Sequence, residues 1–449
     1  MSERNDIEGR RLLRRLFEAG LEAVAPDRAL LRHVRLEGQT LLAGGRIYAC
    51  GPDRRVLVVG GGKGVAPMAR ALESLLGRRL DAGVAVTRYG HGMPLERITL
   101  LEAAHPVPDE AGRRAAEAML DLAQTAGEDD LVIALFTGGA SALTPAPVEG
   151  VTLEDLRLLT RQLLCCGATI HELNALRKHL SRFSGGQLAR ATAPAEVLGI
   201  LVSDVPGDDL DVIASGPTAP DASTFEDCLS IVDRYGLRAS FPKAALRHLE
   251  AGASGQVPET PKQADPLFQK VHNLVVASNR QALEAVAAHA RKMGFAPRFS
   301  ARALAGEARV RAVELAHEAR RLAGALQPGD RPICLLAGGE TTVTVRGAGQ
   351  GGRNQEMALA AALELERDPA YGRVCALFAG TDGIDGTTGA AGGFAFADSA
   401  AAMRRNGADP VALLDDNDSH TALAAADDLL ITGPTKTNVM DLAIVLIQP

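Results

Sequence analysis

Short apolar runs, each followed by a glycine-rich turn and an amphipathic segment, recur along the 449-residue chain. Runs such as VLVV (56–59) and LVIALF (131–136) are too short to span a bilayer and have the length of buried parallel strands. The segments after the turns repeat apolar residues at helical spacing, as in VAPMARALESLL (65–76) and RQALEAVAAHARKMG (280–294). Strands that alternate with helices predict α/β domains with largely parallel sheets, in which ligands bind beyond the carboxyl ends of the strands.

Chain length and one polar segment predict two domains. A chain of 449 residues is too long for a single ordinary core. Residues 251–269 are rich in glycine, proline and polar residues and lack apolar periodicity, which is typical of an interdomain linker or a long surface connection. We expect a Rossmann-like N-terminal α/β domain at 1–250 and a C-terminal α/β domain at 265–449, each with a largely parallel sheet flanked by helices.

Composition and charge exclude several classes of partner. The net charge is −7, aromatic residues make up 3% of the chain and there is no tryptophan, so neither nucleic acid nor an anionic membrane is an expected partner. The charged N-terminus lacks the apolar core of a signal peptide. Six scattered cysteines without a C-x-x-C pair are typical of reduced thiols, and we expect a cytoplasmic protein.

The first glycine-rich turn, GGGKG (60–64), places Lys63 where a helix begins. Helix N-termini bind anions through free N–H groups, and a lysine adds a mobile charge. The turn is not a Walker A loop, because Gly64 stands where that motif needs serine or threonine. A tight turn with a solvated lysine is the alternative, but a lysine at a helix N-terminus is unfavourable for the helix itself, which favours a functional role.

Two further strand ends carry candidate residues. In TGGASAL (137–143), Ser141 could donate to a phosphate or a carboxylate, although a packed turn explains the small residues equally well. In VSDVPGDDLD (202–211), clustered carboxylates hold a cation or serve as turn and helix caps. Asp204 is the best functional candidate of that cluster because it is closest to the strand end.

Residues 347–356, GAGQGGRNQE, match the G-x-G-x-x-G dinucleotide pattern between an apparent strand, TTVTVR (341–346), and an apparent helix. The acid expected about 20 residues further on for NAD is not in place, since Asp382 lies about 30 residues past the last glycine. Arg353 follows the glycines directly, and they would give it and the helix N-terminus clearance to reach a phosphoryl group. A fixed cation with carboxylates such as Glu340 at strand ends suits Mg-nucleotide chemistry.

Two other motifs combine charged residues with prolines or glycines. HPVPDE (105–110) combines prolines that fix a turn with acids that favour a helix N-terminus, and we interpret it as a helix cap. KHLSRFSGGQLA (178–189) brings Lys178, His179 and Arg182 near a Gly-Gly pair. A helix followed by a loop and an anion-binding patch are both compatible with that sequence.

Taken together, these motifs resemble the class II glycerate 2-kinases, a family often labelled hydroxypyruvate reductase or MOFRL-domain protein. The resemblance covers nearly the whole chain, in matching order, through GGGKG, HPVPDE, TGGASAL, NALRKHLSRFSGGQLA, SDVPGDDLDVIASGPT, GGETTVTVRGAGQGGRNQE, GTDGIDGTTGAAGG and LITGPTKTNVMDL. Two positions depart from the family: Lys436 replaces the glycine of TGPTGTNV, and HTALA replaces the aromatic pair that often follows NDSY.

The resemblance implies ATP-dependent phosphorylation of D-glycerate at its 2-hydroxyl, giving 2-phosphoglycerate and ADP. It also implies two α/β domains, the second of MOFRL type, with the active site in the cleft between them, and it leaves a homodimer open. Lys63 and Arg353 match the lysine and arginine that are linked to catalysis in the family, and the family's aspartates match Asp204 and Asp382. The implied cofactors are ATP and Mg²⁺, with Asp204, Glu340 and Asp382 as candidate metal ligands.

Small or polar residues at the strand ends are the expected contacts to nucleotide or substrate. They are Gly61, Gly62, Gly138, Gly139, Ser141, Asn279, Gly338, Gly339 and Asn354. The alternative function is an NAD(P)H-dependent hydroxypyruvate reductase that uses the G-x-G-x-x-G turn. A non-enzymatic reading is a pair of nucleotide-binding sensor domains.

Overall fold

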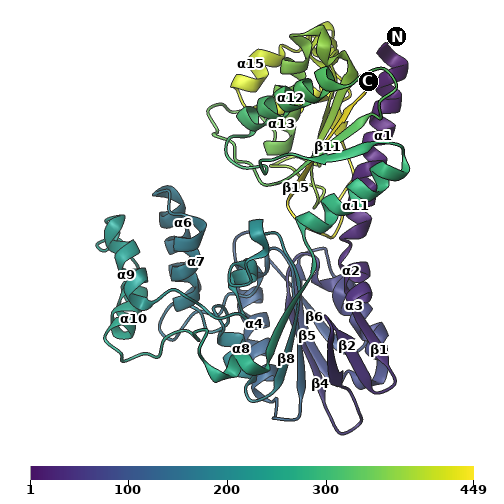
Figure 1. The fold of residues 1–449 in the computed structure, drawn as a ribbon. Helices are drawn as coiled ribbons and strands as arrows, with labels where there is room; N and C mark the ends of the chain where they lie inside the picture. The colour runs from purple at the N-terminus through teal and green to yellow at the C-terminus, as the bar shows by residue number, and fades with distance from the viewer. Residues whose placement is uncertain (1) are drawn as a thin grey trace. The chain divides into compact units, whose positions relative to one another are not determined.

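The structure, a computed structural model, describes residues 2–449, whose contacts form two compact units (Figure 1). The N-terminal unit comprises residues 26–276, and the C-terminal unit comprises residues 2–25 together with 277–449. Two α/β units are present, as predicted. Their limits differ from the expected 1–250 and 265–449, because the first helix packs with the C-terminal unit and the N-terminal unit continues as far as residue 276.

A six-stranded sheet forms the centre of the N-terminal unit. In spatial order its strands are β6 (Ile98–Ala103), β5 (Ala82–Arg88), β4 (Val56–Gly61), β7 (Leu131–Phe136), β8 (Glu196–Val202) and β9 (Val271–Ala277). The pairs from β6 to β8 are parallel, which confirms the predicted parallel sheet. Every residue of β4 and β7 is buried, as their continuous apolar runs require.

Helices and a second, smaller sheet complete the N-terminal unit. The helices are α2 (Pro26–His33), α3 (Val65–Leu76), α4 (Glu110–Gln124), α5 (Ala140–Leu143), α6 (Leu153–Cys165), α7 (Ile170–His179), α8 (Gln187–Thr192), α9 (Phe225–Arg234) and α10 (Lys243–Ala253). The antiparallel small sheet joins β1 (Val34–Glu37), β2 (Thr40–Ala43) and β3 (Arg46–Ala49). Helices α6, α7, α9 and α10 share an apolar core of their own and stand together in Figure 1.

The polar segment at 251–269 is a surface connection inside the N-terminal unit rather than an interdomain linker. Its side chains tie it to the helices around it. The carboxylate of Glu259 accepts a hydrogen bond from the backbone of Phe225, and the hydroxyl of Thr260 donates to Asp221 at 3.0 Å. A segment without apolar periodicity is therefore held by polar contacts.

The sheet of the C-terminal unit is mixed, and the prediction of a largely parallel sheet is wrong here. Its order is β10 (Ala296–Phe299), β11 (Ile333–Gly339), β15 (Asp441–Ile447), β12 (Val374–Gly380), β13 (Gly392–Ala395) and β14 (Leu429–Leu430). Only β10 and β11 pair in parallel; the other pairs are antiparallel. The last strand, β15, inserts between β11 and β12 and is buried along its whole length, so its apolar run does not reveal its direction.

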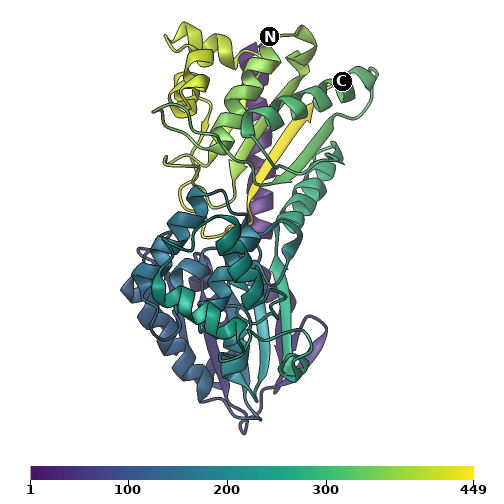
Figure 2. The same ribbon diagram turned by 90° about the vertical axis from the view of Figure 1, so that its left-hand side faces the viewer.

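Helices cover both faces of this sheet. They are α1 (Ser2–Ala23), α11 (Asn279–Lys292), α12 (Ala308–Ala325), α13 (Arg353–Glu366), α14 (Ser399–Arg405), α15 (Pro410–Asp415) and α16 (Ser419–Ala425). Figures 1 and 2 show the purple α1 alongside the yellow β15, and α1 also packs on α11. The charged N-terminus thus forms a helix whose apolar side chains Leu13, Leu16 and Phe17 are fully buried. Within residues 2–449, no helix is long and apolar enough to cross a membrane.

Candidate functional site

The carboxyl ends of β4, β7 and β8 lie side by side in the N-terminal unit, and each is followed by a predicted site residue. The register pairs Gly61 with Phe136, and Phe136 with Leu201. Lys63, Ser141 and Asp204 therefore leave the same edge of one parallel sheet, where α/β proteins bind ligands. Lys63 and Asp204 are both half-buried.

The turns after β4 and β7 interlock through their backbones. The amide of Lys63 donates to the carbonyl of Gly138 at 2.9 Å, and the amide of Gly64 donates to the hydroxyl of Thr137 at 2.9 Å. Gly62 has φ +133°, and a Cβ there would lie 2.2 Å from the Thr137 hydroxyl oxygen. Gly62 is therefore required by the approach of the neighbouring turn, and the amides of Lys63 and Gly64, just before α3, are already engaged.

Gly139 lies beside the side chains of His105 and Lys63. It has φ +87°, and a Cβ at this position would lie 2.9 Å from the His105 ring and 3.2 Å from Cγ of Lys63. His105 belongs to HPVPDE, which the sequence pattern explains as a helix cap. That interpretation is confirmed for Asp109, whose carboxylate accepts from the amide of Gly112 at 3.0 Å, but it missed the position of His105 beside Lys63.

Hydroxyl groups continue this edge of the sheet beyond Gly139. The Oγ atoms of Ser141 and Ser215 are 2.8 Å apart, and Ser215 donates to Oδ1 of Asn174 at 3.5 Å. Ala214 and Ser215 have φ values of 54° and 60°, a conformation that costs energy for residues other than glycine. Two strained residues in succession therefore hold Ser215 against Ser141, and backbone strain of this kind clusters at functional sites.

The cations of the 178–189 motif are all paired within the chain. Lys178 donates to Asp211 at 3.0 Å, His179 bonds Glu259 at 3.0 Å, and Arg182 donates to the carbonyl of Pro147 at 3.1 Å. The structure therefore supports the helix-and-loop explanation of this motif rather than the anion-binding patch.

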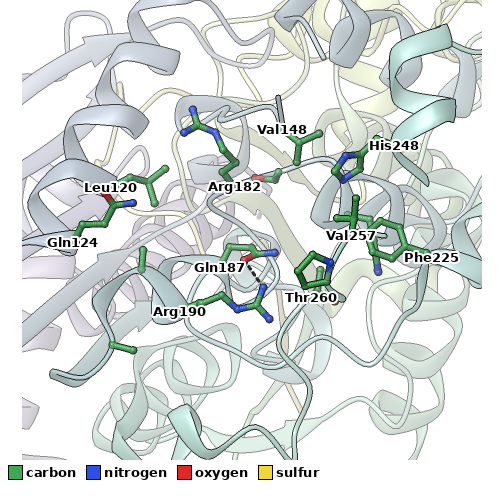
Figure 3. Close-up of a pocket in the computed structure, with 15 residues that line it drawn as sticks. Leu120, Gln124, Val148, Arg182, Gln187, Arg190, Phe225, His248, Val257 and Thr260 are labelled. Carbon is green, nitrogen blue, oxygen red and sulfur yellow. Dashed lines mark hydrogen bonds between the residues drawn. The ribbon is translucent and has the colours of Figure 1, made fainter. Parts of the chain in front are cut away.

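Figure 3 shows a cavity of about 540 Å³ beside this motif, lined among others by Arg182, Arg190 and His248. Arg190 donates to the side chain of Gln187 at 3.1 Å and to the carbonyl of Glu259 at 2.9 Å. Burial lowers the pKa of His248 and so favours its neutral form. The arginines of this cavity are thus satisfied by the protein itself.

In the C-terminal unit, three strand ends gather around Arg353. The register pairs Asp441, the first residue of β15, with Gly339 at the end of β11 and with Gly380 at the end of β12. Arg353 donates to both carboxylate oxygens of Asp441, from Nε at 2.5 Å and from Nη2 at 2.9 Å. Its Nη1 lies 2.8 Å from the carboxylate of Glu340.

The electrostatics fix Arg353 in its charged form. Burial disfavours the charge of the guanidinium and by itself would lower the pKa of Arg353. The hydrogen bond from Arg353 to Asp441 and the negative charges of Asp441 and Glu340 have the larger effect, so the pKa of Arg353 is raised. The Asp441 side chain is 1% exposed and that of Glu340 is 45% exposed, so Asp441 is the strong partner. Sequence reasoning missed Asp441, although a single acid that opens an otherwise apolar buried strand was a signal for it.

The N-terminus of α13 is capped by Asp385. Its carboxylate accepts from the backbone amides of Asn354 at 3.1 Å and Gln355 at 2.8 Å. Burial raises the pKa of Asp385 despite these bonds. The expectation that these amides reach a phosphoryl group is therefore wrong, because an internal carboxylate already occupies them.

The space beside the glycines of the G-x-G-x-x-G pattern is occupied by other residues of the protein, so it is not open to a ligand. A Cβ at Gly347 would lie 2.2 Å from the Asp416 carboxylate, and one at Gly349 would lie 2.3 Å from Cβ of Asp418. The expected strand at 341–346 is also wrong: within it only Thr342 forms an isolated bridge. The strand–turn–helix setting of a dinucleotide site is therefore lost, although the predicted helix is confirmed as α13.

The remaining predicted residues of the C-terminal unit support this edge of the sheet. The side-chain amide of Asn279 donates to the carbonyls of Val439 at 2.8 Å and Asp441 at 3.0 Å. Asp382 is half-buried, and its carboxylate accepts from the amide of Ile384 at 3.1 Å. Oδ1 of Asn354 is buried and receives no hydrogen bond. Within residues 2–449, no group of three or more histidine, cysteine or acidic residues is arranged to hold a metal ion by itself.

Comparisons with known proteins cover nearly the whole chain. Residues 12–250 match a domain of unknown function, DUF4147, and residues 333–441 match the MOFRL family. A glycerate 2-kinase from Pyrococcus horikoshii is 39% identical over 96% of both chains. An Agrobacterium vitis protein provisionally named hydroxypyruvate reductase is 41% identical over 99% of this chain and 95% of its own length.

A solved structure extends the match to the fold. The crystal structure of glycerate kinase from Thermotoga maritima has a TM-score of 0.84 and 38% sequence identity, covering 98% of this chain and 99% of that one. The matches include both units, so the resemblance predicted from the motifs is confirmed. The chain belongs to the family of MOFRL-domain proteins that includes the glycerate 2-kinases.

Proposed function

We propose that this protein is a glycerate 2-kinase, which transfers the γ-phosphoryl group of ATP to the 2-hydroxyl of D-glycerate. The observation that carries the proposal is the similarity to a protein named glycerate 2-kinase over 96% of both chains. That similarity includes the residues after β4, β7, β8, β11 and β12, where the structure gathers charged and small polar side chains.

Phosphoryl transfer demands positioning and charge neutralisation more than covalent participation by the protein. The oxygen of the 2-hydroxyl forms a bond to the γ-phosphorus while the bond to the ADP oxygen breaks, and the hydroxyl proton leaves to a base. We assign the base to Asp204 or Asp382, both half-buried at strand ends. Lys63 and Arg353 neutralise negative charge on the reactants, each within its own unit.

The two cations differ in how they act. Lys63 has a flexible side chain that passes Gly139 and His105. Arg353 is held by Asp441 and Glu340, so it contributes a charge of fixed position. A fixed charge costs no reorganisation when the reaction occurs.

Small residues at the strand ends have binding or positioning roles in this proposal. In the N-terminal unit, Gly138, Gly139 and Ser141 bind phosphate or substrate, and Gly61 and Gly62 let the two turns approach each other. In the C-terminal unit, Gly339 lies opposite Asp441 in the sheet, and the fully buried Asn354 contributes a positioning role through its hydrogen bonds to Asp385. Asn279 and Gly338 position Asp441.

The carboxylates present fit a magnesium ion that arrives with the nucleotide. Mg²⁺ in such sites is held by one or two carboxylates together with phosphates and water, so a cluster of three protein ligands is not required. Glu340 and Asp382 would serve in the C-terminal unit, and Asp204 is the candidate in the N-terminal unit. The ion would neutralise charge on the phosphates.

One experiment separates this function from its alternatives. The protein is mixed with ATP, Mg²⁺ and D-glycerate and ADP is measured, while NAD(P)H oxidation with hydroxypyruvate is followed in parallel. ADP formation that depends on D-glycerate supports the kinase. NAD(P)H oxidation without ADP formation supports the reductase, and nucleotide binding without either reaction supports a sensor.

The structure provides a physical reason to prefer the kinase over the reductase. A dinucleotide site needs free amides at the N-terminus of the helix after the glycine-rich turn. The amides of Asn354 and Gln355 are engaged by Asp385. A pyrophosphate would have to displace that buried carboxylate.

A further inference from the structure

A second cavity of the N-terminal unit, about 480 Å³ in volume, opens beside Gly139 and Ser141. Its walls include the 105–108 loop and residues of α5, α6 and α7, and many are apolar, among them Leu156 and Leu159. The polar groups in the wall include His105, Ser141, Ser215 and Arg177. The cavity is therefore continuous with the predicted phosphate-binding turn.

Arg177 is a half-buried cation that faces this cavity. Within residues 2–449 its guanidinium forms no hydrogen bond and no ion pair. Burial alone lowers its pKa to about 10, so Arg177 stays charged at neutral pH. The other arginines of the same wall are paired: Arg157 donates to the carbonyl of Pro108 at 2.6 Å, and Arg161 donates to Glu154 at 3.0 Å.

A half-buried charge that has lost part of its hydration without gaining a partner is unfavourable for the empty protein. Desolvation of a guanidinium is offset only when an anion or hydrogen-bond acceptors replace water. Neighbouring cations of the same helix have such partners, as Lys178 has in Asp211 and Asp221. Arg177 differs from Lys178 in that it faces a cavity large enough to admit a ligand.

The surroundings of Arg177 indicate what the ligand presents to it. Asn174, one helical turn before Arg177, contacts Ser215, which in turn contacts Ser141. Hydroxyl donors and a guanidinium on one wall suit a carboxylate or a phosphate, whose oxygens accept several hydrogen bonds at once. Gly139, in the same wall, lies beside the side chains of Lys63 and His105.

We infer that Arg177 binds an oxyanion of a reactant in this cavity, either the carboxylate of the acceptor or a phosphate of the nucleotide. The identity of the two reactants rests on the proposed kinase function, whereas the anion site itself does not. Arg177 is thus assigned as a specificity-determining residue in the N-terminal unit, on the same cavity wall as Ser141.

The test compares Arg177→Met with Arg161→Met, a matched control that removes an exposed arginine from the same wall. Dissociation constants for D-glycerate and for ADP are measured by calorimetry on both variants and on the unaltered protein. Loss of a buried charge-assisted contact weakens binding by about 30-fold or more. We expect that loss for one of the two ligands in Arg177→Met and less than about threefold in Arg161→Met.

The ligand that is weakened identifies the source of the oxyanion. Loss of D-glycerate affinity assigns the carboxylate, and loss of ADP affinity assigns a phosphate. Unchanged affinity for both ligands in Arg177→Met overturns the inference.

Thermal unfolding separates a ligand role from a structural role. Because Arg177 has no partner among the described residues, Arg177→Met without ligand should unfold at the same or a higher temperature than the unaltered protein. A lower unfolding temperature would mean that the guanidinium stabilises the fold, and would contradict the inference.

Binding of inorganic phosphate tests the anion site even if the proposed kinase function is wrong. If the unaltered protein binds neither D-glycerate nor ADP, the kinase proposal fails and phosphate alone becomes the probe of the cavity. Phosphate binding that is lost in Arg177→Met but kept in Arg161→Met then supports the anion site. Equal phosphate binding by both variants, or none by the unaltered protein, overturns it.

Discussion

The two glycine-rich turns, at 60–64 and 347–352, are alike in sequence but are used differently. Both combine several glycines with a cation at or beside the start of a helix. In the first, the glycines let two loops interlock and leave the Lys63 side chain beside Gly139 and His105. In the second, carboxylates of the chain fill the space: Asp441 holds Arg353, and Asp385 caps the helix.

This difference shows that a glycine-rich turn does not by itself define a phosphate site. The glycines show only that something approaches the backbone closely. At 347–352 the approaching groups include Asp416 and Asp418, which are residues of the protein and not a ligand. What approaches the glycines must therefore be established for each turn separately: a neighbouring backbone turn at 60–64, and acidic side chains at 347–352.

The largest expected effect is the loss of stability when Arg353 loses its counterion Asp441. Asp441→Ala should lower the free energy of unfolding by about 3 kcal/mol, because it removes the main counterion and two hydrogen bonds from the half-buried guanidinium of Arg353. Chemical denaturation checks this value. Glu340→Ala, which removes the exposed partner, should cost less than about 1 kcal/mol. Equal losses in the two variants would contradict the ranking of the partners.

Lys63→Ala tests the flexible cation. We expect kcat to fall by a factor on the order of 10² to 10³, because a charge that stabilises the transition state is lost. The free energy of unfolding should change by less than about 1 kcal/mol for this half-buried side chain. Steady-state kinetics and denaturation on one preparation check both, with the exposed Lys243→Ala as the control. Near-normal turnover would remove Lys63 from the mechanism.

The variant Asp385→Asn tests how much the carboxyl group that caps α13 contributes to stability, and how that contribution depends on pH. Burial raises the pKa of Asp385 in the folded state above its unfolded value, so the folded state binds the proton more tightly. The contribution of Asp385 to stability is then complete below the unfolded pKa and declines as pH rises through the folded pKa.

The stability advantage of the unaltered protein over Asp385→Asn should therefore be greater at pH 4, at about 1 kcal/mol, than at pH 8. Denaturation at the two pH values measures the difference. An advantage that grows with pH would show that the capped helix favours the ionised carboxylate.

The smallest expected effect is on the stability of the turn that contains Lys436. Lys436 has φ +63°, in the left-handed region that favours glycine. Lys436→Gly should raise the free energy of unfolding by about 0.5 kcal/mol, since relief of this strain exceeds the added flexibility of the unfolded chain. Lys436→Ala keeps a Cβ and should give no such gain. Thermal unfolding of both variants is the measurement.

Local patterns predicted much of the fold. Helix α3 has the predicted bounds, and the continuous apolar runs of β4, β7 and β8 lie in the predicted parallel sheet. The direction of β15 could not be predicted, because a buried strand is apolar on both faces whichever way it runs. The place of the first helix was also unpredictable, since its partners α11 and β15 are distant in sequence.

The sequence predicted several of the charged residues of the candidate site, but not which of them form ion pairs with one another. Arg353 was found from its motif, whereas its partner Asp441 lies 88 residues away. Arg177 stood in the same motif as Lys178 and His179, and nothing in the sequence distinguishes a cation with an internal partner from one that faces a cavity. Pairing is a property of the folded chain, so the partner of Arg353 and the cavity beside Arg177 become visible only in the structure.

The most direct test of the central claim is the phosphorus-31 spectrum of the reaction of this protein with ATP, Mg²⁺ and D-glycerate. The account predicts a phosphomonoester signal from 2-phosphoglycerate that grows in proportion to ADP and is strongly reduced with Lys63→Ala. Formation of 3-phosphoglycerate, or ATP left intact while hydroxypyruvate is reduced by NAD(P)H, would contradict it.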